Sequence, residues 1–567
     1  MPSPSTSEPA WRQFEPKLLT VLREGYSQRA FRNDAIAGLT VAVVALPLAM
    51  ALAIASGAPP EKGLHTAIIA GFLISALGGS RVQIGGPTAA FIPVVFSVIQ
   101  HQGYGGLILC TLLAGLMLIA AGLLRLGALM KFMPQPVITG FTAGIAVSIF
   151  SSQIKDALGL RMGTVPGDFL LRWQAYLAHL SSTQPATVAL TVLGVALIVA
   201  LRRWRPNWPG FLIALLACTL AALALALPVD TIGSRFGDLP AALPEFSIPS
   251  IPLERTRELL PSAFTIAFLA GVESLLSAVV ADGMTGRRHR SNAELIAQGA
   301  ANVGSALFGG LPATGAIART ATNIRAGGTT PMAGILHAAF ILIFMLLLAP
   351  VLRYIPLAGL AAILLIVAWN ISEIETFRRT LSAPKGDRLV LLLTFGLTVT
   401  FDLTVAIEVG LVVAAFVFMF RMSETLEVTS GIQLIGENGG ENPDDARQRL
   451  RLPPGVEAFQ INGPLFFGTS GRLDDLLNRM AAQPRVFILR MRLVPMIDAS
   501  GAHALKGLIE RCQRRDIALI LSGLQPQPRR VLRQMGLGVL QTRVNLVDDF
   551  DAALACAQVL LDEPGKA

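Results

Sequence analysis

The chain has few charged residues and few of the side chains that build metal centres or disulfides. Only 15% of its 567 residues are charged, whereas a soluble domain averages about 25%, and 53% are hydrophobic. Its six histidines and four cysteines form no H-E-x-x-H or C-x-x-C motif; the cysteines lie far apart, at Cys110, Cys218, Cys512 and Cys556. We therefore expect no disulfide, no metal site, no cofactor and no enzymatic activity, and the composition predicts a membrane protein.

The scarce charges are unevenly spread, and their distribution predicts a membrane domain followed by a soluble one. Residues 1–34 hold no apolar core of a signal peptide, so we expect the first membrane span to act as the insertion signal. The predicted domains are a cytoplasmic N-terminal segment (1–34), a transmembrane domain (35–422), a linker with the start of the cytoplasmic domain (423–452) and an α/β domain (453–567). In the last domain strands alternate with helices, which indicates a sheet flanked by helices; the predicted elements are Val456–Ile461, Arg472–Ala482, Val486–Met491, Ala499–Arg514, Ile517–Ser522 and Pro528–Met535.

The membrane domain divides into two sets of seven apolar segments. The first set is 35–56, 63–79, 87–101, 104–124, 135–155, 186–202 and 210–227. The second set is 257–282, 292–308, 315–326, 331–351, 355–370, 387–401 and 403–421. An odd number of spans in each half inverts the second half relative to the first, which is the inverted-repeat arrangement of secondary transporters.

The charged loops orient this arrangement in the cell membrane. The net charge is +9, and no run of alternating basic and aromatic residues indicates nucleic acid. Arginines cluster instead in the short loops after spans six and eight, at positions 202, 203, 205, 287, 288 and 290, whereas the long loop 228–256 is more acidic. Because cytoplasmic loops of membrane proteins are enriched in Arg and Lys, both termini are expected in the cytoplasm.

Each half is interrupted near its third span by a stretch rich in glycine and proline. The first reads Gly85-Gly86-Pro87-Thr88-Ala89-Ala90-Phe91, and the second runs from Gly309 to Thr320 and includes Arg319. Backbone leaves the helix inside a membrane only where it is buried in protein or lines a cavity. The helix N-termini that follow carry partial positive charge and unpaired N–H groups. Two such ends at matching positions predict an anion site.

These motifs resemble the sulfate permease family of anion transporters, which is related to the animal solute-carrier group that includes prestin. The resemblance is carried by Pro47, the runs Ser80–Pro87, Glu273–Ser277 and Gly309–Arg319, and a carboxy-terminal STAS domain with Ile497-Asp498-Ala499-Ser500-Gly501. It implies a polytopic helical protein with fourteen spans in a 7+7 inverted repeat, two half-helices, a cytoplasmic α/β STAS domain, elevator-like motion of a core against a gate, and a homodimer.

The subgroup that the chain resembles most is formed by the bacterial dicarboxylate-transporting members. Leu48 stands where sulfate-transporting members usually have Gln, and Ala318 stands where animal members have Ser. Each change removes a polar contact, so the resemblance leaves sulfate, a C4-dicarboxylate such as succinate or fumarate, and bicarbonate open as substrates.

Two charged residues inside predicted spans are candidates for function. Arg319, one turn into an interrupted helix, suits an anion, because a planar guanidinium matches carboxylate or sulfate oxygens; the alternative is a structural arginine paired with a carboxylate. Glu273 lies mid-way along span eight, where desolvation disfavours its charged form. It could carry a proton with the anion or hold Na⁺, or it could fix helix packing. We favour the proton.

The remaining candidates are small or apolar. The substrate is expected between the starts of spans three and ten, beside Thr88, Ala89, Ala90, Ile317 and Ala318, where small residues let backbone N–H groups approach; tight helix packing is the alternative. By resemblance, Leu48 and Leu52 form an apolar wall, although core packing explains them equally well. Asp282 and Glu294 flank the basic loop and are expected to form salt bridges there.

Ser500 is a candidate regulatory residue, because it occupies the position that is phosphorylated in soluble STAS proteins. A helix N-cap at Asp498 and Ser500 is the more ordinary interpretation. A cytoplasmic partner or a nucleotide could bind this domain.

The sequence thus predicts a proton-coupled secondary transporter for a small anion, embedded in the inner membrane. The alternatives are Na⁺-coupled transport, an anion exchanger, a channel in the same fold, and a membrane-anchored anion sensor that signals through the STAS domain.

Overall fold

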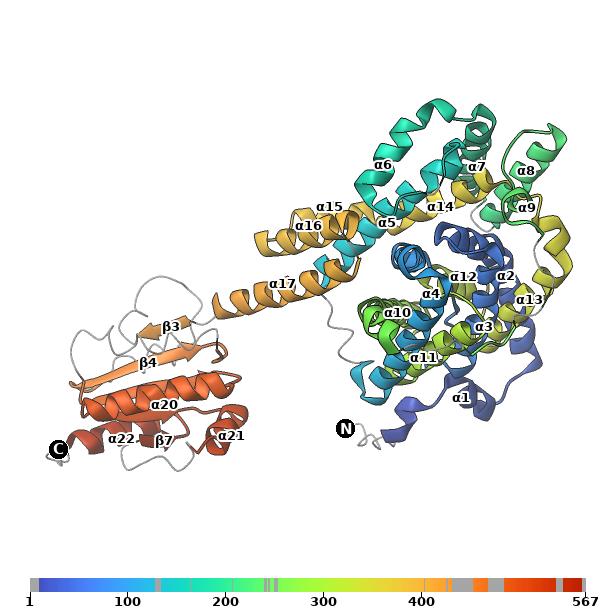
Figure 1. Cartoon of the computed structure of the whole chain (residues 1–567). Coiled ribbons are helices and arrows are strands. Elements are labelled where there is room, and N and C mark those ends of the chain that lie inside the picture. The colour runs from blue at the N-terminus through green and yellow to red at the C-terminus, as the bar shows by residue number, and fades with distance from the viewer. Residues whose placement is uncertain are drawn as a thin grey trace. The chain divides into compact units, whose positions relative to one another are not determined.

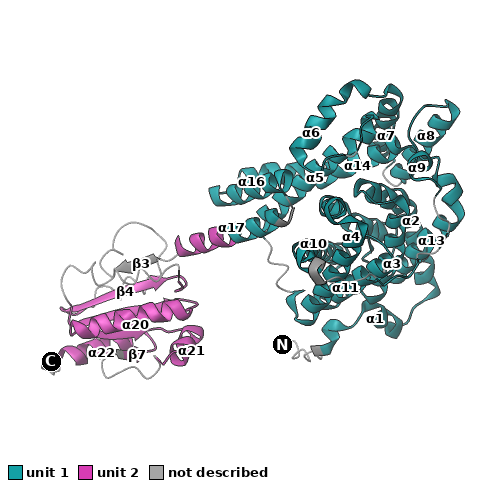
Figure 2. Ribbon diagram, in the orientation of Figure 1, with its two compact units in different colours: residues 1–414 teal, residues 415–567 magenta. Residues whose placement is uncertain are grey.

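The chain forms two compact units, residues 1–414 and 415–567 (Figure 2). The computed structural model describes residues 10–127, 134–163, 165–205, 208–238, 242, 245–248, 253–401, 403–424, 427–430, 452–467, 484–536 and 544–562. Most of the predicted linker 423–452 and the whole predicted helix Arg472–Ala482 lie outside these residues.

Each of the fourteen predicted spans is helical in the first unit or continues from it. The first half contains α2 (Gln28–Ala55), α3 (Pro60–Leu77), η2 (Ala89–Phe91), α4 (Ile92–Leu123), α5 (Gln135–Leu158), α7 (Pro185–Trp204) and α8 (Gly210–Ala224). The second contains α10 (Leu253–Thr285), α11 (Ser291–Leu307), α12 (Ile317–Arg325), α13 (Met332–Leu352), α14 (Leu357–Ile371), α16 (Lys385–Thr400) and α17 (Leu403–Glu424). Predicted spans three and four meet inside α4, where Gly103 adopts a non-helical φ of 72°.

Eight helices in the described residues are long and apolar enough to cross a membrane by themselves. The interrupted helix α12 has only nine residues, and α11 carries four polar side chains that are fully buried, Glu294, Gln298, Asn302 and Ser305. Such elements are stable at membrane depth because neighbouring helices cover them and satisfy their polar groups.

Two helix bundles make up the first unit (Figure 1). In the first, which we call the core bundle, α4 packs against α10 and α11, and α13 packs against α2 and α3; α12 lies against α10 and α2. In the second, the gate bundle, α5 packs against α14 and α16, and α14 packs against α7. The pairs α4–α10 and α13–α2 occupy matching places in the two halves, as do α4–α11 and α13–α3. This packing is the 7+7 inverted repeat expected from the sequence.

Short elements connect and cover the bundles. They are η1 (Ala10–Phe14), α1 (Lys17–Glu24), α6 (Phe169–Ala178), η4 (Leu180–Ser182), α9 (Ile232–Phe236) and α15 (Ile374–Leu381). Near the chain start, Asp34 of α2 is fully buried and accepts hydrogen bonds from the backbone N–H groups of Thr329 and Thr330, at 2.8 and 3.2 Å. The beginning of the first span is therefore tied to the connection between α12 and α13.

The second unit holds a five-stranded sheet in the order β3-β4-β5-β6-β7, with β3 (Glu427–Ser430) antiparallel to β4 (Val456–Asn462). The other strands, β5 (Val486–Leu493), β6 (Ala518–Ser522) and β7 (Val544–Val547), continue in parallel. The helices are α20 (Ala499–Arg514), α21 (Pro526–Gln534) and α22 (Phe550–Asp562). Separate apolar clusters, one with α20 and α21 and one with α22, cover the sheet, as the alternating strand and helix pattern predicts.

Candidate functional site

The two interrupted segments meet in the middle of the core bundle as a short antiparallel pair. β1 (Gly85–Gly86) pairs with β2 (Thr314–Gly315), and the N–H of Ala316 donates to the carbonyl of Ile84 at 3.0 Å. An antiparallel crossing is what an inverted repeat requires, because the two segments run in opposite directions through the membrane. It places the starts of η2 and α12 on either side of one small sheet.

Glycine is required at this crossing. Gly86 has a φ of 151°, which side chains other than glycine rarely adopt, and a Cβ there would come within 2.2 Å of Nη1 of Arg319. A Cβ on Gly315 would come within 1.5 Å of Nε2 of Gln83. The absence of side chains lets the two segments and the guanidinium occupy the same small volume.

The two helix starts differ in how their N–H groups are satisfied. Thr88 caps η2, and its hydroxyl accepts a hydrogen bond from the N–H of Ala90 at 3.4 Å. The corresponding residue of α12 is Ala316, which has no side chain that can cap the helix. The first N–H groups of an α-helix have no partner within the helix. Ile317, the first residue of α12, is 40% exposed, and no side chain caps this helix start.

Arg319 is buried, with only 4% of its surface exposed, and it reaches across to the other segment. Its Nη2 donates to the carbonyl of Pro87 at 3.0 Å, and its Nη1 donates to the carbonyl of Gly85 at 3.4 Å. Its Nε has no hydrogen-bond partner among the described residues. The guanidinium therefore joins the two half-helices and places a positive charge beside both of their starts.

Glu273 on α10 contacts the first half-helix directly. Its Oε1 accepts a hydrogen bond from the hydroxyl of Thr88 at 2.9 Å. Its Oε2 is buried and has no hydrogen-bond partner among the described residues. No ion pair joins Glu273 and Arg319 in the described part of the chain, although the two charges lie close enough to interact. The carboxylate thus has one oxygen anchored and one available for a proton.

Glu294 anchors the backbone just before the first interrupted segment, although it was expected to form a salt bridge at the basic loop. Oε2 of Glu294 accepts from the N–H groups of Gly79 and Ser80, at 2.9 and 3.1 Å. Its Oε1 accepts from the hydroxyl of Ser274 at 3.1 Å and from Nε2 of Gln298 at 2.8 Å. The predicted salt bridge of Glu294 is therefore wrong, because this side chain is fully buried in α11. Its neighbour in that prediction, Asp282, does pair with a residue of the basic loop, His289, at 2.6 Å.

An amide performs the same task in the second segment. Oδ1 of Asn302 accepts from the N–H of Ala313 at 2.9 Å, and its Nδ2 donates to the carbonyl of Ala313 at 2.8 Å. The hydroxyl of Thr66 accepts from the N–H of Leu311 at 2.6 Å. Polar side chains of α3 and α11 therefore fix the course of the backbone just before β2.

These anchoring residues were missing from the predicted site. Their signal was available, because Glu294, Gln298, Asn302 and Ser305 follow one another at intervals of three or four and lie on one face of α11. A polar stripe in an apolar helix marks a face that contacts other polar groups. Only the fold reveals that its partners are the backbone groups of the interrupted segments.

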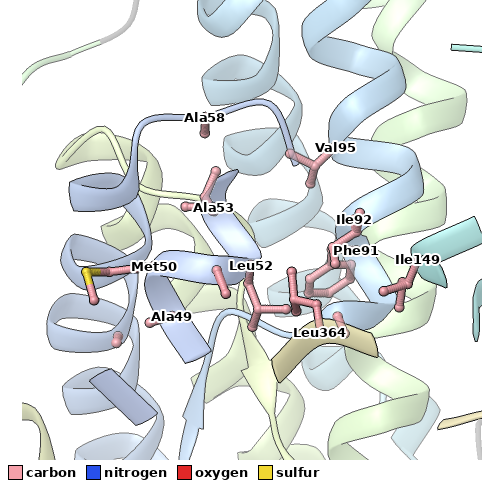
Figure 3. Packing of buried hydrophobic residues seen from close by; sticks show 14 of the residues in the cluster. Ala49, Met50, Leu52, Ala53, Ala58, Phe91, Ile92, Val95, Ile149 and Leu364 are labelled. Carbon is pink, nitrogen blue, oxygen red and sulfur yellow. The ribbon is translucent and has the colours of Figure 1, made fainter. Parts of the chain in front are cut away.

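Leu52 and Leu48, predicted either as an apolar wall or as core packing, both lie in the apolar packing around η2 (Figure 3). Leu52 of α2 is 2% exposed and lies beside Phe91 of η2, with Ile149 of α5 and Leu364 of α14 close by. Leu48 is partly buried and packs against the same cluster. Residues of the core bundle and of the gate bundle meet in this cluster.

Ser500 lies far along the chain from these residues, in the second unit, and is the second residue of α20. Oδ1 of Asp498 accepts from the N–H of Gly501 at 2.7 Å, so Asp498 is the N-cap. Ser500 is exposed and lines a surface hollow of about 600 Å³ together with His503 and Arg511.

Comparison with known proteins identifies the family. The sulfate permease family matches residues 31–394, and the STAS domain matches residues 448–549. The putative sulfate transporter YvdB of Bacillus subtilis is 42% identical over 516 residues, which cover 91% of this chain and 95% of that protein. The bicarbonate transporter BicA of Picosynechococcus is 32% identical over 524 residues, which cover 90% and 91%.

A solved structure shares the fold of the whole chain. The murine anion transporter Slc26a9, in its inward-facing state, matches with a TM-score of 0.85 at 19% identity, covering 99% of this chain and 96% of that one. The family matches confirm the resemblance to the sulfate permease family that the sequence motifs indicated. The chain is a polytopic membrane protein that belongs to the sulfate permease family of anion transporters and carries a C-terminal STAS domain.

Proposed function

We propose that the chain is a secondary active transporter that moves a small anion together with a proton. The observation that carries the proposal is the crossing of β1 and β2, which brings the starts of η2 and α12, Arg319 and Glu273 together. The anion binds beside Thr88, Ala89 and Ala90 of the first half-helix and Ile317 and Ala318 of the second. Backbone N–H groups and the field of Arg319 stabilise it.

The coupling follows from the charge balance of the site. When Glu273 is ionised, its charge offsets that of Arg319, and the hydroxyl of Thr88 is committed to the carboxylate. A proton on Oε2 removes the negative charge and leaves the guanidinium to attract the anion. Proton and anion therefore favour each other's binding, which is the requirement for symport.

Sulfate and C4-dicarboxylates such as succinate are the substrates that we favour, because two anionic ends suit two half-helix starts and an arginine. A relative described as a putative sulfate transporter, 42% identical, supports sulfate. Bicarbonate transport, coupled to H⁺ or Na⁺, is the second candidate, and the likeness to BicA favours it. The core and gate bundles suit an elevator-type motion, and we propose cytoplasmic termini, an inner-membrane location and a homodimer.

Uptake by purified protein in liposomes tests this function. Labelled sulfate, succinate and bicarbonate are offered separately, with an inward pH gradient, an inward Na⁺ gradient or neither, to wild type and Glu273→Gln. The Gln variant imitates the protonated carboxyl group, so we expect anion exchange to persist and gradient-driven accumulation to be lost. Asp387→Asn, a change of the same kind in the first turn of α16, is the control.

Each outcome discriminates between candidates. Accumulation of one anion with the pH gradient, lost in Glu273→Gln, supports the proposal and identifies the substrate. Accumulation that requires the Na⁺ gradient would identify Na⁺, and not the proton, as the coupling ion. Flux that depends neither on the gradients nor on the substitution would identify a channel or an exchanger. If none of the three anions moves, a sensor that signals through the STAS domain becomes the better account.

A further inference from the structure

A large cavity lies between the core and gate bundles, near the C-terminal ends of α2, α5 and α16. Its volume is about 840 Å³. Along α4 its wall runs from Ile92 to His101, so it follows the first half-helix and begins just after η2. Thr88, Glu273 and Arg319 are not among the described residues that line it. It is therefore a different space from the proposed binding site.

Along the chain, an apolar layer around Phe91 lies between Thr88 and the cavity wall, which begins at Ile92. Phe91 directly precedes Ile92, is 2% exposed, and packs with Leu52, Ile149 and Leu364 (Figure 3). Two of these residues belong to the core bundle and two to the gate bundle, so the layer opens only when the bundles shift. In this conformation, an anion that enters the cavity stays on the cavity side of the apolar layer.

The charged groups of the cavity wall favour an anion. Three cationic side chains line it, Lys155 of α5, Arg172 of α6 and Arg235 of α9, against two carboxylates, Asp156 and Asp168. The wall contributed by α4 has no carboxylate: its polar members are Ser97, Gln100 and His101. The excess of positive charge thus comes from elements outside the core bundle.

The carboxylates are already committed, whereas the cations retain donors. Nη1 of Arg235 contacts Oδ1 of Asp156 at 2.6 Å, and Asp168 caps α6 by accepting from the N–H of Leu171 at 3.0 Å. Nζ of Lys155 donates to the carbonyl of Gly163 at 2.9 Å. A lysine has three N–H donors and an arginine has five, so Lys155 and Arg235 can bind an oxyanion without losing these contacts.

Arg172 has a different part in the wall. It is 8% exposed, it donates to the carbonyls of Pro166 and Gly167 at 3.0 and 2.8 Å, and its guanidinium lies 5.5 Å from the ring centre of Phe96 on α4. It adds positive charge behind the wall while it holds the loop before α6 in place. Its contact with Phe96 also joins the gate side to the core bundle.

We propose that this cavity is a loading site for a small, partly hydrated oxyanion such as sulfate or a carboxylate. Lys155 and Arg235 bind the anion, and Asp156 limits its affinity by neutralising Arg235. The inference rests on the proposed transport function, and it adds a second anion site that fills before the apolar layer opens. With the N-terminus in the cytoplasm, the loading site faces the outside of the cell.

The ion pair between Arg235 and Asp156 provides a test that separates charge from structure. Arg235→Gln and Asp156→Asn both break the pair, but they change the cavity charge in opposite directions. The loss of the structural contact is common to both variants, so changes of opposite sign report the charge of the cavity rather than the broken contact. If the cavity binds anions, Arg235→Gln weakens anion entry and Asp156→Asn strengthens it.

The measurement is the reaction of a cysteine in the cavity, introduced by Ser97→Cys, with anionic and cationic thiosulfonate reagents of equal size. The ratio of the two rates reports the local potential, because effects on thiol reactivity cancel. We expect Arg235→Gln to lower the ratio about threefold and Asp156→Asn to raise it about threefold. Arg379→Gln, which breaks an exposed pair with Glu375 on α15, is the matched control and leaves the ratio unchanged. The reaction of the native cysteines is measured in the protein that keeps Ser97 and is subtracted.

Sulfate protection completes the test. Millimolar sulfate is expected to slow the anionic reagent more than gluconate does at equal ionic strength, and Arg235→Gln removes this difference. The loading site is overturned if the two pair-breaking variants shift the ratio in the same direction or leave it unchanged, or if sulfate gives no protection. Uptake measured in the same liposomes distinguishes failure of the loading site from failure of the proposed transport. If uptake is normal but the substitutions do not change the ratio of the two reaction rates, the loading site alone is rejected. If the ratio changes but no anion is taken up, the proposed transport is rejected.

Discussion

The two interrupted segments of this transporter share a backbone plan but differ in chemistry. The first leads into a helix start that is capped by Thr88 and is anchored by the carboxylate of Glu294. The second leads into an uncapped start at Ala316 and is anchored by the amide of Asn302. Only the second carries a cation, Arg319, and its guanidinium contacts the first segment.

The comparison shows how an inverted repeat becomes a site with two unequal sides. Symmetry supplies the crossing of β1 and β2 and the opposed helix starts. Asymmetry supplies the chemical difference: one start is capped by a side chain that also contacts Glu273, and the other has no side-chain cap. The predictions below remove or exchange these differences.

Removing the cation is expected to have the largest effect. Arg319→Ala eliminates the positive charge and leaves the carbonyls of Gly85 and Pro87 without their donor. Hydrogen bonds to charged groups contribute about 1.5–3 kcal/mol each, so anion uptake should fall by about 100-fold or more. Arg319→Lys keeps the charge but cannot reach two carbonyls in a fork, and it should retain a few per cent of the activity. Equal uptake by wild type and Arg319→Ala in liposomes would remove Arg319 from the site.

The glycines at the crossing should differ in sensitivity. Gly86→Ala meets both an unfavourable φ and the guanidinium of Arg319, whereas Gly315→Ala meets only the side chain of Gln83. Both should lower uptake, and Gly86→Ala should do so by about tenfold more, because strain at a positive φ costs about 1–2 kcal/mol in addition to the clash. Uptake normalised to the folded protein in a size-exclusion profile measures this. A larger loss of uptake in Gly315→Ala than in Gly86→Ala would show that the side chain of Arg319 moves aside for a Cβ more easily than the side chain of Gln83 does.

The two anchors allow a comparison of stability. Glu294→Ala leaves four buried donors without an acceptor, whereas Asn302→Ala removes the partner of the carbonyl and the N–H of Ala313 alone, since the carbonyl of Gln298 keeps its bond within α11. Since an orphaned buried group costs about 1–3 kcal/mol, Glu294→Ala should lower the unfolding temperature of the detergent-solubilised protein more. Glu294→Gln should be milder, because the side chains of Ser274 and Gln298 can rotate to accept from the new amide. If Glu294→Gln unfolds as readily as Glu294→Ala, the negative charge itself is required.

Exchanging the caps should have the smallest effect and the most specific one. Ala316 has the extended backbone of an N-cap, so Ala316→Ser can cap α12 and stabilise it by about 0.5–2 kcal/mol. The new hydroxyl occupies N–H groups that the anion needs, and the KM for uptake should rise about threefold while the unfolding temperature rises. Thr88→Ala, which uncaps η2, should lower the unfolding temperature. A fall in KM with Ala316→Ser would place the anion away from the start of α12.

Much of the fold follows from local sequence signals. Apolar segments of span length, the arginine-rich loops and the Gly/Pro interruptions predicted fourteen helices in two halves, and α20 begins and ends at the predicted residues. These signals are local, because each helix satisfies its own backbone within a membrane. The boundary between predicted spans three (87–101) and four (104–124) is confirmed as well, since the backbone leaves the helical conformation at Gly103 within α4.

The site itself was predicted only in part. Glycine, proline and an intramembrane arginine mark where the chain leaves the helix, so Arg319, Thr88 and Glu273 could be proposed from the sequence. The role of Glu294 could not, because a carboxylate beside a basic loop predicts a surface ion pair, and only the packing of α11 against the turn at Gly79 shows otherwise.

The sequence by itself therefore determined the apolar spans, the repeat and the residues that interrupt it. These depend on hydropathy and on backbone preferences that each segment carries alone. The tertiary structure decided which interrupted segment pairs with which, that Arg319 contacts the opposite segment, and that a cavity lined by Lys155 and Arg235 lies beyond the apolar layer around Phe91. These features join residues that are distant in the chain, and the physical reason is that inverted halves can satisfy their exposed backbone and bury their charges only against each other.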